Sequence, residues 1–141
     1  MQRVDWNRLE TRWPGIANLE GVWLLGSSQA GVMRRGGDID IGVLFSLPPA
    51  LDLFLELRAQ IQELLQVEAV DLVDLHAASP ILRFEVVQGR RLYGRNPQHL
   101  AEFVSLTARE YEDEMAQAAR YWGYHNSGGR LETTNGNWTS R

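Results

Sequence analysis

The stretch from residue 38 to residue 75 constrains the fold more than any other part of the sequence, because two strand patterns enclose a helix pattern. Residues 38–45 alternate polar and apolar side chains before turning apolar, and residues 67–75 are apolar and rich in β-branched types. Between them, residues 51–65 place their apolar side chains at helical spacing. A helix that joins two strands favours a parallel crossover within one sheet. The sequence therefore predicts an α/β fold.

The flanking residues continue this alternation of helices and strands. We expect a helix at 4–13, a buried strand at 21–25, a short helix within 27–33, a helix at 79–87, an edge strand at 91–93 and a long helix from 97 onward. The long helix carries one apolar stripe, made of Leu100, Phe103, Val104, Tyr111, Met115, Ala119 and Trp122.

The end of the long helix sets the expected limit of the folded domain. Tyr121 and Trp122 are expected to lie in the core or at its lip rather than to stack on a base. We expect one domain over residues 1–124. Residues 125–141 are expected to be a disordered tail, because this segment is mostly polar and glycine-rich and has no periodicity.

Composition excludes several classes of function. The chain of 141 residues contains no cysteine, which excludes a disulfide scaffold, a thiolate metal site and a cysteine nucleophile. Its net charge of -4 argues against direct binding of nucleic acid through a broad basic face. No apolar stretch is long enough for a transmembrane helix, and the first residues are too charged for a signal peptide. We therefore expect a cytoplasmic protein without a membrane partner.

Closely spaced carboxylates indicate a candidate metal site. Asp38 and Asp40 share one face of their expected strand, with Cα atoms roughly 6.6 Å apart. At an effective dielectric constant of ~20 two such charges repel by roughly 2–3 kcal/mol. A third carboxylate can come from Asp71 or Asp74, which point to opposite faces, so periodicity leaves both open. Three converging carboxylates suit Mg²⁺.

A candidate phosphate site precedes the paired aspartates. Gly26 and Ser27 lie where the strand at 21–25 ends and a helix is expected to begin, and a helix N-terminus offers backbone N–H groups to a phosphate. Gly26 allows close approach of a ligand, and the Ser27 hydroxyl can donate to a phosphate oxygen. Arg34 and Arg35 follow in a basic turn, either as phosphate ligands or as a solvated pair.

These motifs together resemble a known superfamily. Gly26-Ser27, ten further residues, Asp38-x-Asp40 and a later aspartate on an apolar strand resemble the DNA polymerase β nucleotidyltransferase superfamily. The short chain is similar to its minimal nucleotidyltransferases (MNT), the antitoxin partners of HEPN toxins. The resemblance covers roughly residues 5–124 and implies the polymerase β-like fold, a mixed sheet with flanking helices.

The resemblance also implies a site and a reaction. Asp38, Asp40 and Asp71 match the catalytic carboxylates that hold two Mg²⁺ ions, and Gly26 and Ser27 match the triphosphate-binding motif. The implied reaction transfers AMP from ATP to a tyrosine of a HEPN ribonuclease and silences it, which makes the chain a protein adenylyltransferase and an antitoxin.

One departure from the family pattern leaves a second hypothesis open. Many relatives read G-S-x-A-R-G, whereas this chain has Gln29-Ala30-Gly31 and lacks the arginine at that point. Arg34 and Arg35 are candidates to supply the missing charge. The alternative hypothesis is a non-catalytic antitoxin that neutralises its partner by occlusion.

Overall fold

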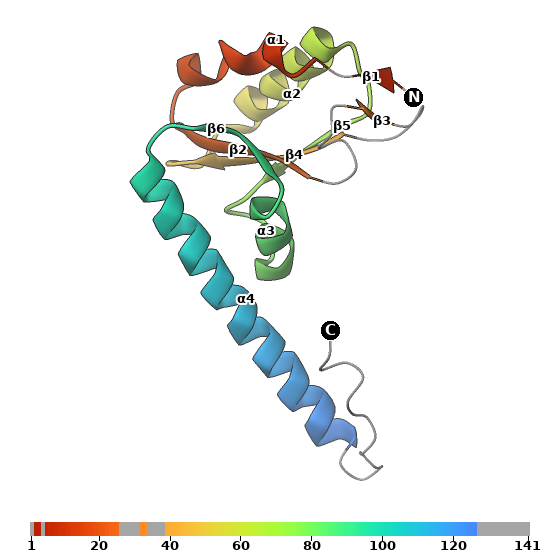
Figure 1. Cartoon of the computed structure of the whole chain (residues 1–141), viewed down its shortest axis with the longest axis vertical. Helices are drawn as coiled ribbons and strands as arrows, with labels where there is room; N and C mark the ends of the chain where they lie inside the picture. The colour runs from red at the N-terminus through yellow and green to blue at the C-terminus, as the bar shows by residue number, and fades with distance from the viewer. Residues whose placement is uncertain (1, 4, 26–31, 34–38, 127–141) are drawn as a thin grey trace.

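A four-stranded mixed sheet forms the centre of the protein (Figure 1). The computed structural model describes residues 2–3, 5–25, 32–33 and 39–126 of the chain. The strands lie in the order β5 (Val70–Asp74), β4 (Ile39–Phe45), β2 (Leu19–Leu25) and β6 (Arg90–Gly94). β5 and β4 are parallel, whereas β2 is antiparallel to both β4 and β6. The predicted α/β fold with a mixed sheet is confirmed, and so is the edge strand expected near residue 92.

The predicted crossover is present with the expected helix bounds. Helix α2 (Leu51–Leu65) connects β4 to β5, and these two strands pair in parallel. Leu57, Ile61 and Leu65 form its buried face at helical spacing. The local pattern therefore determined both the helix and the pairing of the strands around it.

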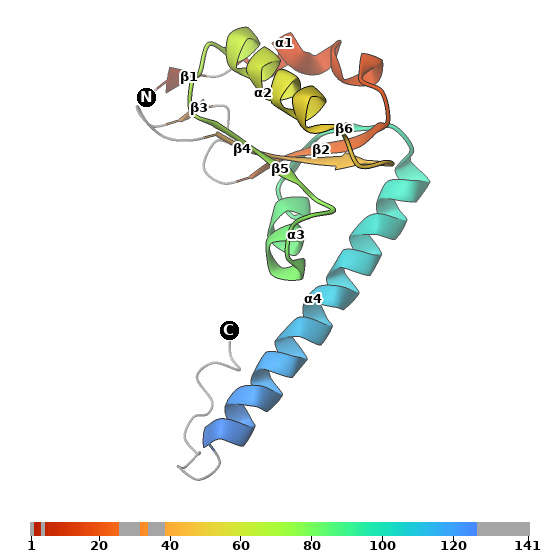
Figure 2. The same ribbon diagram turned by 180° about the vertical axis from the view of Figure 1, so that it is seen from behind.

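Helices cover both faces of the sheet (Figures 1 and 2). Helix α1 (Asn7–Glu10), the 3₁₀ turn η1 (Trp13–Gly15) and α2 lie on one face, and α3 (Pro80–Val87) and α4 (Pro97–Asn126) lie on the other. Because strand side chains alternate, Ile39, Ile41 and Val43 of β4 pack toward α2, whereas Leu44 belongs to the core on the α3 side. Two separate apolar cores result.

Two expected helices differ from the structure. The helix expected at 4–13 is only the short α1 followed by η1, because Pro14 stands inside the turn that redirects the chain. The short helix expected within 27–33 is wrong at its end, since β3 (Val32–Met33) pairs antiparallel with β1 (Gln2–Arg3). Residues 26–31 lie outside the described residues.

Side-chain caps fix the starts of α3 and α4, at the two points where the sequence predicts helices to begin. The Ser79 hydroxyl accepts a hydrogen bond from the backbone N–H of Leu82 at 3.2 Å. The Asn96 side chain accepts from the backbone N–H groups of Gln98 and His99 at 3.0 and 3.2 Å. Each cap is followed by proline at the first helical position, where no donor is needed.

Helix α4 is 30 residues long and extends beyond the sheet layers (Figures 1 and 2). Tyr121 and Trp122 are each 55% exposed, so the expectation that they belong to the core or its lip is wrong. Helical spacing specifies a stripe, but only the tertiary fold specifies how far along the helix that stripe is covered. Among the described residues, neither α4 nor any other helix is both long and apolar enough to cross a membrane.

Helix α3 packs closely on β4 at Gly42, and this contact gives the first testable prediction. A Cβ atom at Gly42 would overlap the Cγ1 methyl of Val86, whereas a Cβ atom at Gly15 meets nothing within 4 Å. We expect Gly42→Ala to lower the free energy of unfolding by about 1–3 kcal/mol through overpacking. Gly15→Ala, the matched control, is expected to change it by less than about 0.5 kcal/mol. Urea denaturation measures both values, and equal midpoints for the two variants would contradict this packing.

Candidate active site

Two of the candidate carboxylates lie side by side on neighbouring strands. Asp40 is the second residue of β4, Asp71 is the second residue of β5, and the two are direct partners in the parallel register. Adjacent strands are about 4.8 Å apart, and paired residues carry their side chains on the same face. The sheet therefore holds these two carboxylates next to each other.

The face from which the carboxylates project follows from their strand neighbours. Asp40 alternates with Gly42 and Leu44, which lie against α3 and in the α3-side core, respectively. Asp71 alternates with Val73 and Leu75, which pack in the same core. Both carboxylates therefore project from the sheet face that carries α3 and α4.

The end of β2 lies at the same edge of the sheet. Leu25, its last residue, is the antiparallel partner of Asp40, so β2 ends beside the paired aspartates. Gly26 and Ser27 follow Leu25 directly in the sequence, but they lie outside the described residues. The predicted site residues Asp38, Arg34 and Arg35 also lie outside them. The structure thus brings together Asp40, Asp71 and Leu25, the residue that precedes the candidate phosphate segment.

Asp74, the alternative third carboxylate, lies on the opposite face of β5. Its register partner is Val43, which belongs to the core on the α2 side. Its carboxylate also accepts a hydrogen bond from the backbone N–H of His76 at 3.1 Å, which closes the turn after the strand. The register therefore places Asp71, and not Asp74, beside Asp40.

Asp71 is exposed at the outer edge of the sheet. No hydrogen bond or salt bridge reaches its carboxylate from any residue in the described ranges. It borders a hollow of about 210 Å³ that is also lined by Arg58, Ala69 and Val70. The Arg58 guanidinium donates through Nε to the carbonyl of Val70 at 2.9 Å, which places a cation near Asp71. Sequence analysis missed Arg58, because an arginine on an amphipathic helix carries no motif.

The chemistry of these donors fits a divalent cation. Two carboxylates about 5 Å apart repel each other by about 1–3 kcal/mol at effective dielectric constants between 80 and 20, and a cation between them reverses that cost. Carboxylate oxygens are the ligands that Mg²⁺ prefers. The described residues contain no group of three acidic or histidine side chains that could hold a metal, and Asp38, the third member of the predicted set, lies outside them. The two described carboxylates therefore fit a Mg²⁺ site that a further ligand completes.

Comparison with known proteins finds one matching family. The family described as "Polymerase beta, Nucleotidyltransferase" matches residues 14–98, which include β2, β4, α2 and β5. These elements carry Asp40, Asp71 and the end of β2. No curated protein matches the chain.

Several solved structures are similar to this chain. A toxin–antitoxin complex with AMP-PNP is 29% identical over 84% of this chain and 95% of its own, with a TM-score of 0.71. A mutant of the toxin–antitoxin pair MntA–HpeT is also 29% identical over the same shares, with a TM-score of 0.73. A complex of tri-AMPylated HEPN toxin from Shewanella oneidensis with MNT antitoxin is 27% identical over 83% of this chain and 95% of its own, with a TM-score of 0.64.

Proposed function

Because the chain belongs to the polymerase beta nucleotidyltransferase family, as its sequence predicts, we propose that it is an MNT antitoxin that transfers AMP from ATP to a tyrosine hydroxyl of a HEPN-type ribonuclease toxin. The observation that carries the proposal is the pairing of Asp40 with Asp71 beside the end of β2. Further support comes from the similar structures, one with AMP-PNP and one with a tri-AMPylated HEPN toxin. The nucleotide and the protein acceptor are both drawn from these relatives.

The proposed roles are those that the family resemblance implies for these residues, and for Asp40 and Asp71 the strand register supports them. Asp38, Asp40 and Asp71 would hold two Mg²⁺ ions, which supply positive charge to the triphosphate and to the attacking oxygen. Gly26 and Ser27, directly after β2, would bind the β- and γ-phosphates through backbone N–H groups and the hydroxyl. Arg34 and Arg35 would add positive charge on the phosphate side.

The reaction exchanges a phosphoanhydride bond of ATP for a phosphodiester bond to the acceptor. The acceptor hydroxyl oxygen forms a bond to the α-phosphorus of ATP, and the bond from that phosphorus to the oxygen bridging to the β-phosphate breaks. Pyrophosphate leaves, and the hydroxyl proton passes by way of the Asp71 carboxylate to solvent. The chain contributes mainly by positioning the reactants and placing charge. Asp40 and Asp71 suit this role because paired strands hold them rigidly.

Removal of the metal gives a direct test of this proposal. We expect ATP and Mg²⁺ to add AMP-sized mass increments to the HEPN-type partner, as measured by intact-protein mass spectrometry. Replacing Mg²⁺ with EDTA should remove these increments, and renewed Mg²⁺ should restore them, because phosphoryl charge needs a counter-ion in the site.

A nucleotide analogue provides the matched control. An ATP analogue with a methylene group between the α- and β-phosphates keeps the shape of ATP but cannot break that bond, so it should add no mass. A partner that is inhibited but never modified with ATP and Mg²⁺ would contradict catalysis and support occlusion instead.

A further inference from the structure

Helix α4 carries one apolar stripe, and its first half is covered by the rest of the domain. Leu100 is 1% exposed, and Phe103 and Val104 pack against the same core as α3. Farther along, Tyr111 stacks on Phe84 of α3 with ring centroids 4.1 Å apart. The stripe is therefore a packing surface as far as Tyr111.

The same stripe continues past Tyr111 to Met115 and Trp122. We call residues 112–126 the outer half of α4. Here α4 runs on away from the sheet and beyond the end of α3 in both ribbon views (Figures 1 and 2). Met115, four residues after Tyr111, is 38% exposed. Trp122, one heptad farther, is 55% exposed although its ring contacts Tyr121. Within the residues that the structure describes, an apolar surface thus extends along α4 past the contacts with α3 that cover its first half.

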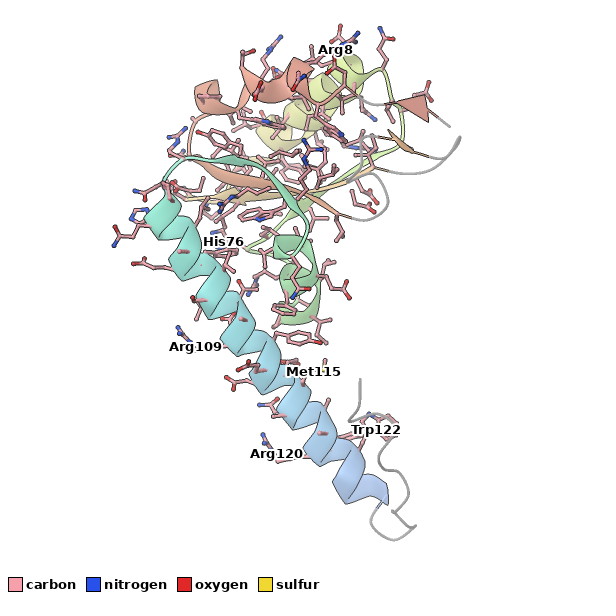
Figure 3. All side chains as sticks on the ribbon, in the orientation of Figure 1. Arg8, His76, Arg109, Met115, Arg120 and Trp122 are labelled. Carbon is pink, nitrogen blue, oxygen red and sulfur yellow. The ribbon has the colours of Figure 1, made fainter. Side chains whose placement is uncertain are left out.

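The orientation of the stripe is visible in Figure 3. Met115 and Trp122 lie on the side of α4 that faces α3, whereas Arg109 and Arg120 lie on the opposite side. Helical spacing places Ala118 and Ala119 between Met115 and Trp122 on the same side. Small residues between two large ones allow another helix to approach closely.

Packing against another surface would stabilise the outer half of α4 further. It is continuous with the packed first half, so no new helix has to be nucleated, and most helical stability in proteins comes from packing of an apolar face. A contiguous exposed apolar face is typical of a docking site, especially where acidic or basic residues border it. Helical spacing places Glu112 and Glu114 on the two borders of this stripe and Asp113 on the far side.

The stripe lies on the same side of the sheet as the candidate active site. Asp40 and Asp71 project from the sheet face that carries α3 and α4. A protein that binds along the outer half of α4 therefore occupies the side from which the carboxylates project. This arrangement can bring an acceptor hydroxyl to the site without a second acceptor-binding domain.

We propose that the outer half of α4 docks the acceptor protein. Met115 and the small residues after it would enter an apolar groove on that protein, and Glu112 and Glu114 would meet basic side chains along its rim. The inference rests on the proposed function, because it takes the protein that receives AMP as the occupant of the stripe.

Variants on the two sides of α4 test this docking surface. Met115→Glu is expected to weaken binding of the HEPN-type partner at least about tenfold, because it places a charge in an apolar contact. Leu106→Glu is the matched control, since Leu106 is 46% exposed on the far side of the same helix and should leave affinity unchanged. Glu112→Lys should weaken binding at low salt, whereas Asp113→Lys should not.

Two measurements separate this inference from the proposed function. Calorimetry without nucleotide measures docking alone, and AMP transfer at saturating partner measures chemistry alone. We expect Met115→Glu to raise the KM for the partner with kcat unchanged. Wild-type affinity in Met115→Glu would overturn the docking inference even if AMP transfer is observed. If neither the wild type nor any variant transfers AMP, but Met115→Glu still weakens partner binding, only the proposed chemistry is overturned.

A second copy of the chain is the competing occupant. Sedimentation of the chain alone distinguishes it, because Met115→Glu would then convert a dimer to a monomer while the affinity for the HEPN-type partner stays at the wild-type value. That result would overturn docking of the acceptor on this stripe. Circular dichroism of each variant verifies that α4 remains helical.

Discussion

Replacing Asp71 with asparagine is expected to lower the kcat/KM of AMP transfer by about 10²–10³-fold while leaving the fold intact. The substitution keeps the shape of the side chain but removes the negative charge beside Asp40. Charge stabilisation by a bound metal is worth several kcal/mol, and each 1.36 kcal/mol corresponds to about a factor of ten in rate. The loss should appear as fewer AMP-sized increments on the partner per unit time. Because Asp71 is exposed, stability should change by less than about 0.5 kcal/mol.

Asp74 supplies a matched control three residues farther along the same strand. It lies on the opposite face of β5, and its contact with the His76 backbone N–H requires only an oxygen acceptor, which asparagine retains. Asp74→Asn should therefore transfer AMP at the wild-type rate. Equal decreases in kcat/KM for Asp71→Asn and Asp74→Asn would contradict the inference that the strand register with β4 identifies Asp71 as the catalytic carboxylate.

Asp40→Asn is expected to match Asp71→Asn, because the proposed function assigns both carboxylates to one metal site. For the same reason the double variant should lose little more than either single variant. Additive losses would indicate that the two side chains act separately.

Much of the fold could be predicted because its signals are local. The apolar spacing of residues 51–65 gave the bounds of α2. The helices expected at 79–87 and from 97 onward correspond to α3 and α4. Strand–helix–strand order then gave the parallel pairing of β4 and β5. Each of these inferences depends on residues that are close in the sequence.

The features that the sequence could not predict depend on distant residues. The short pair β1 and β3 forms between segments about 30 residues apart, and two residues per strand carry no periodicity. The exposure of Met115 and Trp122 depends on where α3 ends in space. The amino-acid pattern along α4 carries no information about that position.

The candidate site shows the same division between local and distant information. Alternation along β5 separates Asp71 from Asp74, but the choice between them needs the register with β4. The family resemblance favoured Asp71 at the sequence level, and the register now places it beside Asp40. Arg58 could not be found, because it reaches the site through a backbone contact with Val70.

Arg83→Met is expected to lower the free energy of unfolding by about 2–4 kcal/mol, the largest stability effect that we predict. The Arg83 guanidinium donates to the carbonyls of Leu75 and Ala78 at 2.8 and 2.7 Å and to the Glu110 carboxylate at 2.7 Å. Its side chain is only 16% exposed. Methionine fills similar space but leaves these partly buried acceptors without their donor. Urea denaturation monitored by circular dichroism measures the change.

Glu110→Gln separates the ion pair from the backbone contacts of Arg83. Glutamine still presents an oxygen to Arg83, and the Glu110 side chain is 38% exposed, so removal of its charge should cost less than about 1 kcal/mol. Equal decreases in the free energy of unfolding for Arg83→Met and Glu110→Gln would mean that the ion pair accounts for the stabilising effect of Arg83. The larger loss in Arg83→Met would instead show that this side chain stabilises the turn between β5 and α3.

That turn and Glu110 together hold α3 against α4, and α4 in turn carries the proposed docking surface. Arg83→Met is therefore also expected to weaken partner binding, whereas Glu110→Gln should leave it nearly unchanged.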